Sequence, residues 1–210
     1  MVNYMQEFNN SVYFDGNDYY MQSVKLQEFS ENHETPFYVY DMNFIIDNYN
    51  KLKACFPWEN VKLHYAMKAN YNPHMLKIMK DNGFCLDTVS PAEVIMAKKL
   101  GFDSENILFT ANNMTDAEMD LIKSQDVLFN IDSLYRLEAY GKAYNGSKVC
   151  LRINPDVQAG ENAKVATAGA ESKFGILLED VHKAIAIAKE NNIKIVGLHE
   201  HTGSGIADTG

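Results

Sequence analysis

Short apolar runs alternate along the chain with longer stretches in which apolar residues recur at helical spacing. The short runs are rich in β-branched and aromatic residues, and they predict strands at 37–40, 61–67, 84–87, 107–110, 127–131, 148–153 and 193–199. The longer stretches predict helices near 73–82, 91–100, 115–125, 133–143 and 179–191. Strands that are separated by helices in this way predict βαβ units and a parallel sheet.

The starts of several predicted helices carry residues that helix termini prefer. Pro73 and Pro91 suit a first helical turn, where a backbone N–H would have no partner in any case. Ser90-x-x-Glu93 and Thr115-x-x-Glu118 each match the capping-box pattern. These local signals support the helix starts that the apolar spacing predicts.

From Val61 onward the pattern contains six strands with five helices between them. This count suits either a doubly wound sheet or a (β/α)8 barrel, which needs about 250 residues and would be incomplete here. Residues 1–40 are polar and rich in tyrosine, and they predict a short strand or two and a helix near 23–32. We expect this segment to be a leader to the barrel or part of a second domain. Glycines crowd the last eight residues, directly after a strand, so we expect a fragment of a longer protein.

Composition and charge exclude several classes of protein. Hydrophobic residues make up 46% of the 210 residues and charged residues 22%, and no apolar run approaches the roughly 20 residues of a membrane-spanning helix. The formal net charge of -9 argues against nucleic acid or a membrane surface as the main partner. Residues 1–10 lack the pattern of a signal peptide, and three widely spaced cysteines fit no disulfide framework. We therefore expect a soluble, cytoplasmic protein.

Residues with catalytic potential follow several of the predicted strands. Catalytic groups in barrels and open α/β sheets gather at the carboxyl ends of the strands. The residues at those ends are Lys68, Asp87, Arg152, His199 and His201, with Asn112 and Asp132 after the two strands between. Arginine is scarce, since Arg136 and Arg152 are the only two in the chain. An amine, a carboxylate, a guanidinium and two imidazoles at one edge of a sheet predict an active site.

Several of these candidates also have a plainer interpretation. Lys68 is either a surface lysine in water or a partly desolvated amine whose lowered pKa suits Schiff-base chemistry. The turn from His199 to Gly205 contains the Gly-Ser-Gly sequence of a phosphate cradle, but an ordinary tight turn has the same composition. His199 and His201 lie on one face of a strand and would also suit a metal. A metal site needs a further ligand, and parity predicts that His64 is buried in mid-strand rather than placed at an end.

Six motifs, in order along the chain, resemble those of the fold-type III pyridoxal-phosphate decarboxylases. They are Thr35-Pro-Phe-Tyr-Val-Tyr-Asp41, Tyr65-Ala-Met-Lys-Ala-Asn70, Asp87-Thr-Val-Ser-Pro-Ala-Glu93, Leu151-Arg-Ile-Asn-Pro155, Ser172-Lys-Phe-Gly-Ile176 and Gly197-Leu-His-Glu-His-Thr-Gly-Ser204. The resemblance implies an α/β fold, a (β/α)8 TIM-type barrel of the alanine racemase-like kind, which would be incomplete and span residues 41–210. Residues 1–40 would belong to a β-sandwich domain beside the barrel.

The resemblance also implies a cofactor, pyridoxal 5'-phosphate, and roles for the strand-end residues. Lys68 would be the catalytic residue that binds the cofactor's aldehyde covalently, and His201 would stack on the cofactor ring. Glu93 would join a polar network around the ring and the lysine, and His199 receives no role. The other cofactor-binding residues would be Asp87 and Arg152 in that network, and Gly203, Ser204 and Gly205 at the phosphate.

The reaction that the resemblance implies is loss of CO2 from an amino acid. The Leu-Arg-Ile-Asn-Pro and Gly-Leu-His-x-His segments favour meso-diaminopimelate as substrate and L-lysine as product, whereas relatives that act on ornithine, arginine or lysine share Lys68 and the turn. Two subunits of this family pair head to tail and share their active sites. Later motifs of the family would follow Gly210, so we expect this chain alone to be inactive. A non-catalytic cofactor-binding relative and a metal-dependent barrel hydrolase are the alternatives.

Overall fold

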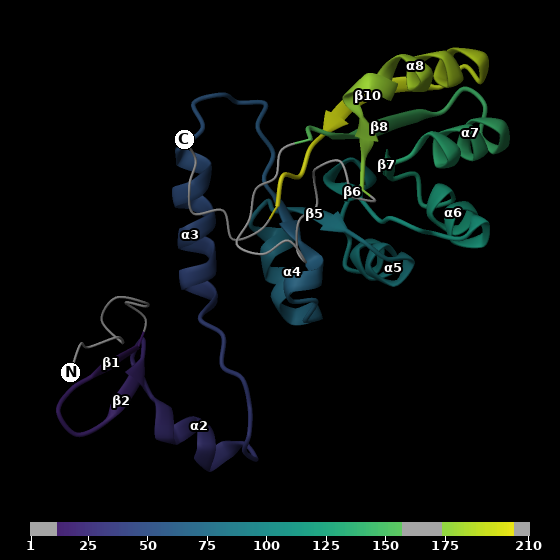
Figure 1. Cartoon of the computed structure of the whole chain (residues 1–210). Helices are drawn as coiled ribbons and strands as arrows, with labels where there is room; N and C mark the ends of the chain where they lie inside the picture. The colour runs from purple at the N-terminus through teal and green to yellow at the C-terminus, as the bar shows by residue number, and fades with distance from the viewer. Residues whose placement is uncertain (1–11, 157–173, 204–210) are drawn as a thin grey trace. The chain divides into compact units, whose positions relative to one another are not determined.

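The computed structural model describes residues 12–156 and 174–203 of the chain (Figure 1). Contacts divide the chain into two compact units, Met1–Val61 and Lys62–Gly210. The expected boundary after residue 40 and the assignment of the first segment to a β-sandwich domain stay predictions. No helix in the described part of the chain is both long enough and apolar enough to cross a membrane.

The described residues of the first unit form a small antiparallel sheet and two α-helices. Strands β1 (Val12–Phe14), β2 (Tyr19–Met21) and β3 (Val24–Lys25) pair in sequence order, and helix α2 (Leu26–Asn32) follows directly. Asp15 holds the turn between β1 and β2, because its carboxylate accepts hydrogen bonds from the N–H groups of Asn17 and Asp18, both at 2.9 Å. The structure thus confirms the short strands and the helix near 23–32.

The strand predicted at residues 37–40 is wrong. These residues have no regular secondary structure and pair with none of the described strands, and Tyr38 is 89% exposed. Aromatic and β-branched residues favour a strand only where a neighbouring strand and a packed face are available. The pattern was therefore too local to predict pairing.

Helix α3 (Met42–Ala54) is missing from the sequence prediction. Asp41 caps it, since the Asp41 carboxylate accepts a hydrogen bond from the Phe44 N–H at 3.0 Å. Ile45, Tyr49 and Leu52 stand at helical spacing behind this cap. A capping aspartate followed by that spacing is the signal that would have found the helix.

The second unit is built on a parallel sheet whose strands follow the predicted runs. The strands are β4 (His64–Ala66), β5 (Cys85–Thr88), β6 (Ile107–Phe109), β7 (Leu128–Ile131), β8 (Lys148–Asn154), β9 (Ile176–Leu177) and β10 (Lys194–His199). All the pairs are parallel, in the order β10-β8-β7-β6-β5-β4, and β9 pairs separately with β8. The two-residue strand β9 was not predicted.

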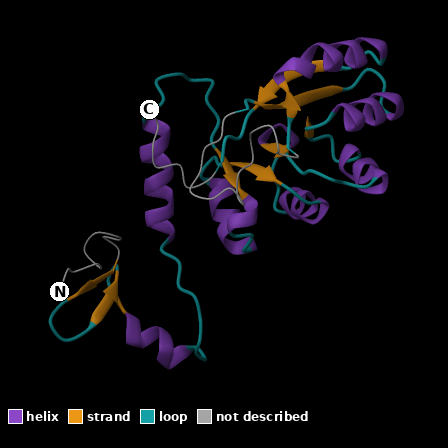
Figure 2. Cartoon of the chain, in the orientation of Figure 1, coloured by secondary structure: helices purple, strands orange, loops and turns teal. Residues whose placement is uncertain are grey.

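In the described residues of this unit, five α-helices alternate with these strands and lie around the outside of the sheet (Figure 2). They are α4 (Pro73–Asp81), α5 (Pro91–Lys99), α6 (Asp116–Lys123), α7 (Leu134–Ala143) and α8 (Val181–Glu190). Thr115 and Glu118 form the predicted capping box at α6. Ser90 caps α5 with its hydroxyl alone, because the Glu93 carboxylate binds the Val89 N–H instead.

The strand order decides between the two architectures that the sequence left open. A doubly wound sheet reverses its strand order at a switch point between the two halves. From β4 to β10 the strands on the main path follow one another in sequence with no reversal, and each is joined to the next by a helix, as in the wall of a (β/α) barrel. The arrangement therefore favours the barrel.

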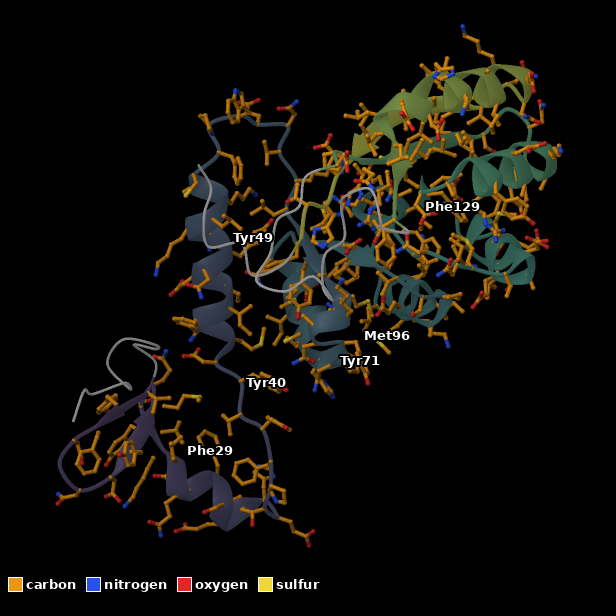
Figure 3. The ribbon with its side chains drawn as sticks, in the orientation of Figure 1. Phe29, Tyr40, Tyr49, Tyr71, Met96 and Phe129 are labelled. Atoms are coloured by element: carbon orange, nitrogen blue, oxygen red, sulfur yellow. The ribbon has the colours of Figure 1, made fainter. Side chains whose placement is uncertain are left out.

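Side chains of the sheet alternate between a face that packs on the helices and an inner face. Phe109 and Phe129 lie opposite each other in the register, with ring centroids 5.5 Å apart, and Phe129 also contacts Tyr140 of α7 at 5.0 Å (Figure 3). Burying each ring contributes roughly 1.5–3 kcal/mol. Because the period of a strand is two, the neighbours of these rings point to the inner face, which carries Asp87, Asn130 and Arg152.

Candidate active site

The candidate catalytic residues lie at the carboxyl ends of the strands, which meet at one edge of the parallel sheet. Asp87 lies in β5 and Arg152 in β8, and His199 ends β10 directly opposite Arg152 in the register. Lys68 follows β4 in a single 3-10 turn, Met67–Ala69, and His201 stands two residues beyond β10. The structure thus brings together the amine, the guanidinium, the carboxylate and both imidazoles that the sequence singled out.

Arg152 is the buried cation of this edge. Its side chain is 6% exposed, and its Cζ lies 5.0 Å from the centre of the Phe174 ring. Burial lowers the pKa of Arg152, while the negative charges of Asp132 and Asp87 act in the opposite direction. Burial raises the pKa of Asp132, and Arg152 opposes that shift. An arginine remains protonated under such conditions, so the site holds a fixed positive charge.

Asp87 is held in place by the residue that directly follows the neighbouring strand, β6. The Thr110 hydroxyl donates a hydrogen bond of 2.6 Å to Asp87 Oδ1, and Thr110 is 8% exposed. A carboxylate that accepts such a bond has one oxygen oriented and the other available to a ligand. Sequence reasoning missed Thr110, although it lies on the same inner face as Asp87 by strand parity.

Glu93 acts on the backbone of the loop after β5. Its carboxylate accepts a hydrogen bond from the Val89 N–H at 2.6 Å, and the Glu93 N–H donates to the Ser90 hydroxyl at 3.3 Å. These bonds fix the chain between Asp87 and helix α5. The membership of Glu93 in a network around a cofactor stays a prediction.

Lys68 is exposed in the structure, as a surface lysine in water would be, and is not a desolvated amine. Its charge nevertheless reaches His201. Burial lowers the pKa of His201, and the positive charges of Arg152 and Lys68 lower it further. His201 is therefore held as the neutral imidazole at neutral pH, a form that suits stacking against a ring.

His199 is hydrogen-bonded to a residue that the sequence did not indicate. Its Nδ1 lies 3.2 Å from the amide nitrogen of Asn130, a side chain that is 1% exposed. Burial lowers the pKa of His199, and the charge of Arg152 lowers it further. The amide oxygens of Asn112 and Asn130 are buried and have no hydrogen-bond partner among residues 12–156 and 174–203. Two acceptors at neighbouring strand ends are thus available to a donor.

Two further expectations concern a metal site that would include His64 and the glycine turn after β10. His64 is exposed rather than buried, because β4 has a strand neighbour on one side alone within the described part, and its Nδ1 lies 3.0 Å from the Leu86 carbonyl oxygen. No group of three or more His, Cys, Asp or Glu side chains in that part is placed to hold a metal ion. Gly203 follows β10 as expected, whereas Ser204 and Gly205 lie outside the described residues.

A family model matches most of the chain. The family is the pyridoxal-dependent decarboxylases, specifically their pyridoxal binding domain, and the match spans residues 42–210. The matched range contains every strand-end residue described above, from Lys68 to His201.

The curated relatives are similar over nearly all of the chain. The diaminopimelate decarboxylase of Aquifex aeolicus is 33% identical over 210 residues, covering 97% of this chain and 50% of that protein. The diaminopimelate decarboxylase of Bacteroides thetaiotaomicron is 37% identical over 184 residues, covering 84% of this chain and 48% of the relative. The chain therefore spans about half the length of the curated relatives that it matches.

Solved structures show the same likeness in three dimensions. A crystal structure of diaminopimelate decarboxylase from M. jannaschii in co-complex with L-lysine has a TM-score of 0.83 at 30% identity. The alignment covers 95% of this chain and 49% of that chain. Together with the family match, this likeness confirms the barrel fold of the alanine racemase-like kind that the six motifs imply.

Proposed function

The chain belongs to the pyridoxal-dependent decarboxylases, and from that premise we propose that it forms the cofactor-binding part of a diaminopimelate decarboxylase. The reaction would remove CO2 from meso-diaminopimelate and leave L-lysine. One observation carries the proposal: Lys68, Arg152 and His201 lie at the carboxyl ends of their strands, at one edge of the sheet, and the charges of Lys68 and Arg152 both reach His201. The relatives that match the chain carry the names of enzymes for this reaction.

The groups at this edge fit pyridoxal 5'-phosphate chemically. The cofactor has an aldehyde, for which Lys68 offers an exposed amine, and it is anionic, for which buried Arg152 offers a positive charge. The amide oxygens of Asn112 and Asn130, which have no hydrogen-bond partner in the described part of the chain, would accept hydrogen bonds from polar groups or water beside it. When bound, the cofactor supplies an electron sink for the charge that departing CO2 leaves behind.

The residues of this chain would bind and orient the reacting groups. Lys68 would bind the aldehyde through Nζ and hold a proton there when the amino group of the substrate displaces it. Asp87, oriented by Thr110, and Arg152 would orient the ring. His201 would stack on the ring as a neutral imidazole. Gly203 would begin the turn that binds the phosphate, continued by Ser204 and Gly205.

An assay of CO2 release from meso-diaminopimelate by the full-length protein with added cofactor tests the reaction. We expect turnover of diaminopimelate and none of ornithine, arginine or lysine. Turnover of one of these three amino acids in place of diaminopimelate would show that the substrate is wrong while the family reaction stands. Bound cofactor without turnover of any amino acid would favour a non-catalytic relative.

We further propose that the complete enzyme is a homodimer in the cytoplasm, with active sites shared between subunits. The likeness to the decarboxylase family supports the dimer. Cys55, Cys85 and Cys150 form no disulfide among the described residues, which suits a reducing compartment. Sedimentation of the full-length protein measures its mass in solution, and a monomer that is fully active would contradict the shared site.

A further inference from the structure

Residues 174–177 lie against the carboxyl end of β8. Ile176 and Leu177 form β9, which pairs in parallel with Ile153 and Asn154. Gly175 comes closer still: at its φ of +84°, an added Cβ would lie 2.8 Å from the backbone nitrogen of Asn154 and 3.0 Å from the carbonyl carbon of Ile153. Any side chain at position 175 would have to displace the backbone of β8, so glycine is required there.

This close approach places the Phe174 ring over the guanidinium of Arg152, which stands two residues before Asn154. The Cζ of Arg152 lies 5.0 Å from the ring centroid, and Arg152 is 6% exposed. A cation over an aromatic face is attracted by the ring quadrupole, most strongly when both are withdrawn from water. Arg152 is buried and Phe174 is half-buried, so water screens this contact less than it would an exposed pair.

Other charged and titratable groups also act on Arg152. Asp132 and Asp87 attract its positive charge, and the electrostatic influence of Arg152 also reaches His199 and His201. Coulombic attraction to a carboxylate restricts where the positive charge of Arg152 lies. A flat ring restricts the orientation of the planar group as well, because guanidinium stacks on aromatic faces.

We propose that Phe174 is a positioning residue for Arg152: its ring fixes the guanidinium at the cofactor site, and Gly175 allows the ring to reach it. The consequence for cofactor binding rests on the function proposed above. The contact between the Phe174 ring and the Arg152 guanidinium does not depend on that function, so the contact and its effect on cofactor binding are tested separately.

The chain offers a matched control in its other arginine. Arg136 also lies beside an aromatic ring, with its Cζ 5.9 Å from the centroid of Tyr135, but Tyr135 is 76% exposed. Arg136 is held instead by Asp116 at 2.9 Å and by the Met114 carbonyl oxygen at 2.5 Å. Removing the ring of Tyr135 therefore tests the loss of an aromatic neighbour of arginine away from the proposed site.

Cofactor affinity is measured by absorbance titration of the full-length apoprotein with pyridoxal 5'-phosphate. Phe174→Leu keeps an apolar side chain and removes the ring, and we expect it to weaken binding about tenfold, equivalent to about 1.4 kcal/mol. Phe174→Tyr keeps the ring and should bind within about twofold of the wild type. Tyr135→Leu should bind as the wild type does. In an Arg152→Lys background, which lacks the planar group, Phe174→Leu should change affinity less than about twofold.

Arginine side-chain NMR provides a readout without cofactor. The ring current of Phe174 should shift the Arg152 Nε–Hε signal, assigned by its loss in Arg152→Lys, and Phe174→Leu should abolish that shift with the melting temperature retained. Equal effects of Phe174→Leu in both backgrounds, or an unchanged Arg152 signal, would overturn the proposal. A shifted signal in a protein that binds no cofactor at all would overturn the proposed function and leave the contact standing.

Discussion

The two ends of the parallel sheet carry very different groups. At the carboxyl end, Arg152 is 6% exposed and lies within electrostatic reach of Asp87 and Asp132. At the amino end there is a cavity of about 710 Å³, whose lining includes Lys123 and Lys148. Both ends are built from the same strands, so the difference lies in which side chains the strand direction and the loops place there.

The comparison shows that a cavity by itself does not identify a site. Lys148, Glu105 and Asp126 of the amino-end cavity are exposed, so water solvates their charges. At the carboxyl end, by contrast, burial and neighbouring charges lower the pKa values of both His199 and His201. Perturbed titratable groups that cluster at strand ends are typical of functional sites.

The largest expected effect is on the rate of decarboxylation, and it distinguishes a lysine at the carboxyl end of the sheet from one at the amino end. Lys68→Ala should reduce decarboxylation on the order of 10³-fold or more, because it removes the amine that binds the cofactor covalently. Lys148→Ala, at the amino-end cavity, should leave the rate unchanged. Steady-state CO2 release under saturating cofactor measures both, and a comparable loss in Lys148→Ala would remove the distinction between the ends.

Two glycines with the same backbone conformation make the second comparison. Gly175 and Gly146 have φ values of +84° and +81°, but an added Cβ meets the β8 backbone at Gly175 and nothing within 4 Å at Gly146. Gly146→Ala should cost about 1 kcal/mol in free energy of unfolding, from backbone strain alone. Gly175→Ala should cost about 3 kcal/mol, since the clash with Asn154 is added. Urea unfolding measures both, and equal costs would contradict the close approach.

A hydroxyl at each end provides the third comparison. Thr110→Val removes the bond to Asp87 and should weaken cofactor binding about tenfold, the equivalent of about 1.5 kcal/mol for a hydrogen bond to a charged group. Ser104→Ala removes a hydroxyl that donates to the Gln125 carbonyl oxygen at 3.1 Å near the amino end, and binding should not change. Absorbance titration compares the two, and unaltered affinity in Thr110→Val would mean that Asp87 needs no such support.

The smallest expected effect is a change in pH dependence. The folded-state pKa of His199 lies below its ordinary 6.5, through burial first and Arg152 next, with His201 acting in the same direction and Asp87 and Glu200 against it. The unfolded chain therefore binds a proton first as the pH falls below 6.5, and the free energy of unfolding decreases. His199→Gln should flatten this decrease, measured by urea unfolding at about pH 7.5 and 5.5. A steeper dependence in the variant would contradict the sign.

Apart from the short strand β9, the sequence predicted the described strands and α-helices of the second unit because their periodicity is local. It also predicted which residues stand at the strand ends, since Lys68, Asp87, Arg152 and His199 each end or follow an apolar run. Strand direction then brings them to one edge without any knowledge of pairing. The wrong strand at 37–40 has the same cause, because a local pattern contains no information about a partner strand.

The side chains that contact these residues could not be predicted from the sequence. Thr110 lies 23 positions from Asp87, and Asn130 lies 69 positions from His199, so each contact depends on strand register. The ring of Phe174 meets Arg152 because Gly175 approaches β8, a fact of three-dimensional geometry. Knowing the strand order in advance would have allowed parity to indicate Thr110 and Asn130, though not Phe174.

The most direct test of the account locates the covalent bond between protein and cofactor. The full-length protein is incubated with pyridoxal 5'-phosphate, reduced with borohydride and digested, and the modified peptide is identified by mass spectrometry. We predict a single modified lysine, Lys68, at the carboxyl end of the sheet. Modification of Lys123 or Lys148 at the amino-end cavity, or of scattered lysines with none at Lys68, would contradict it.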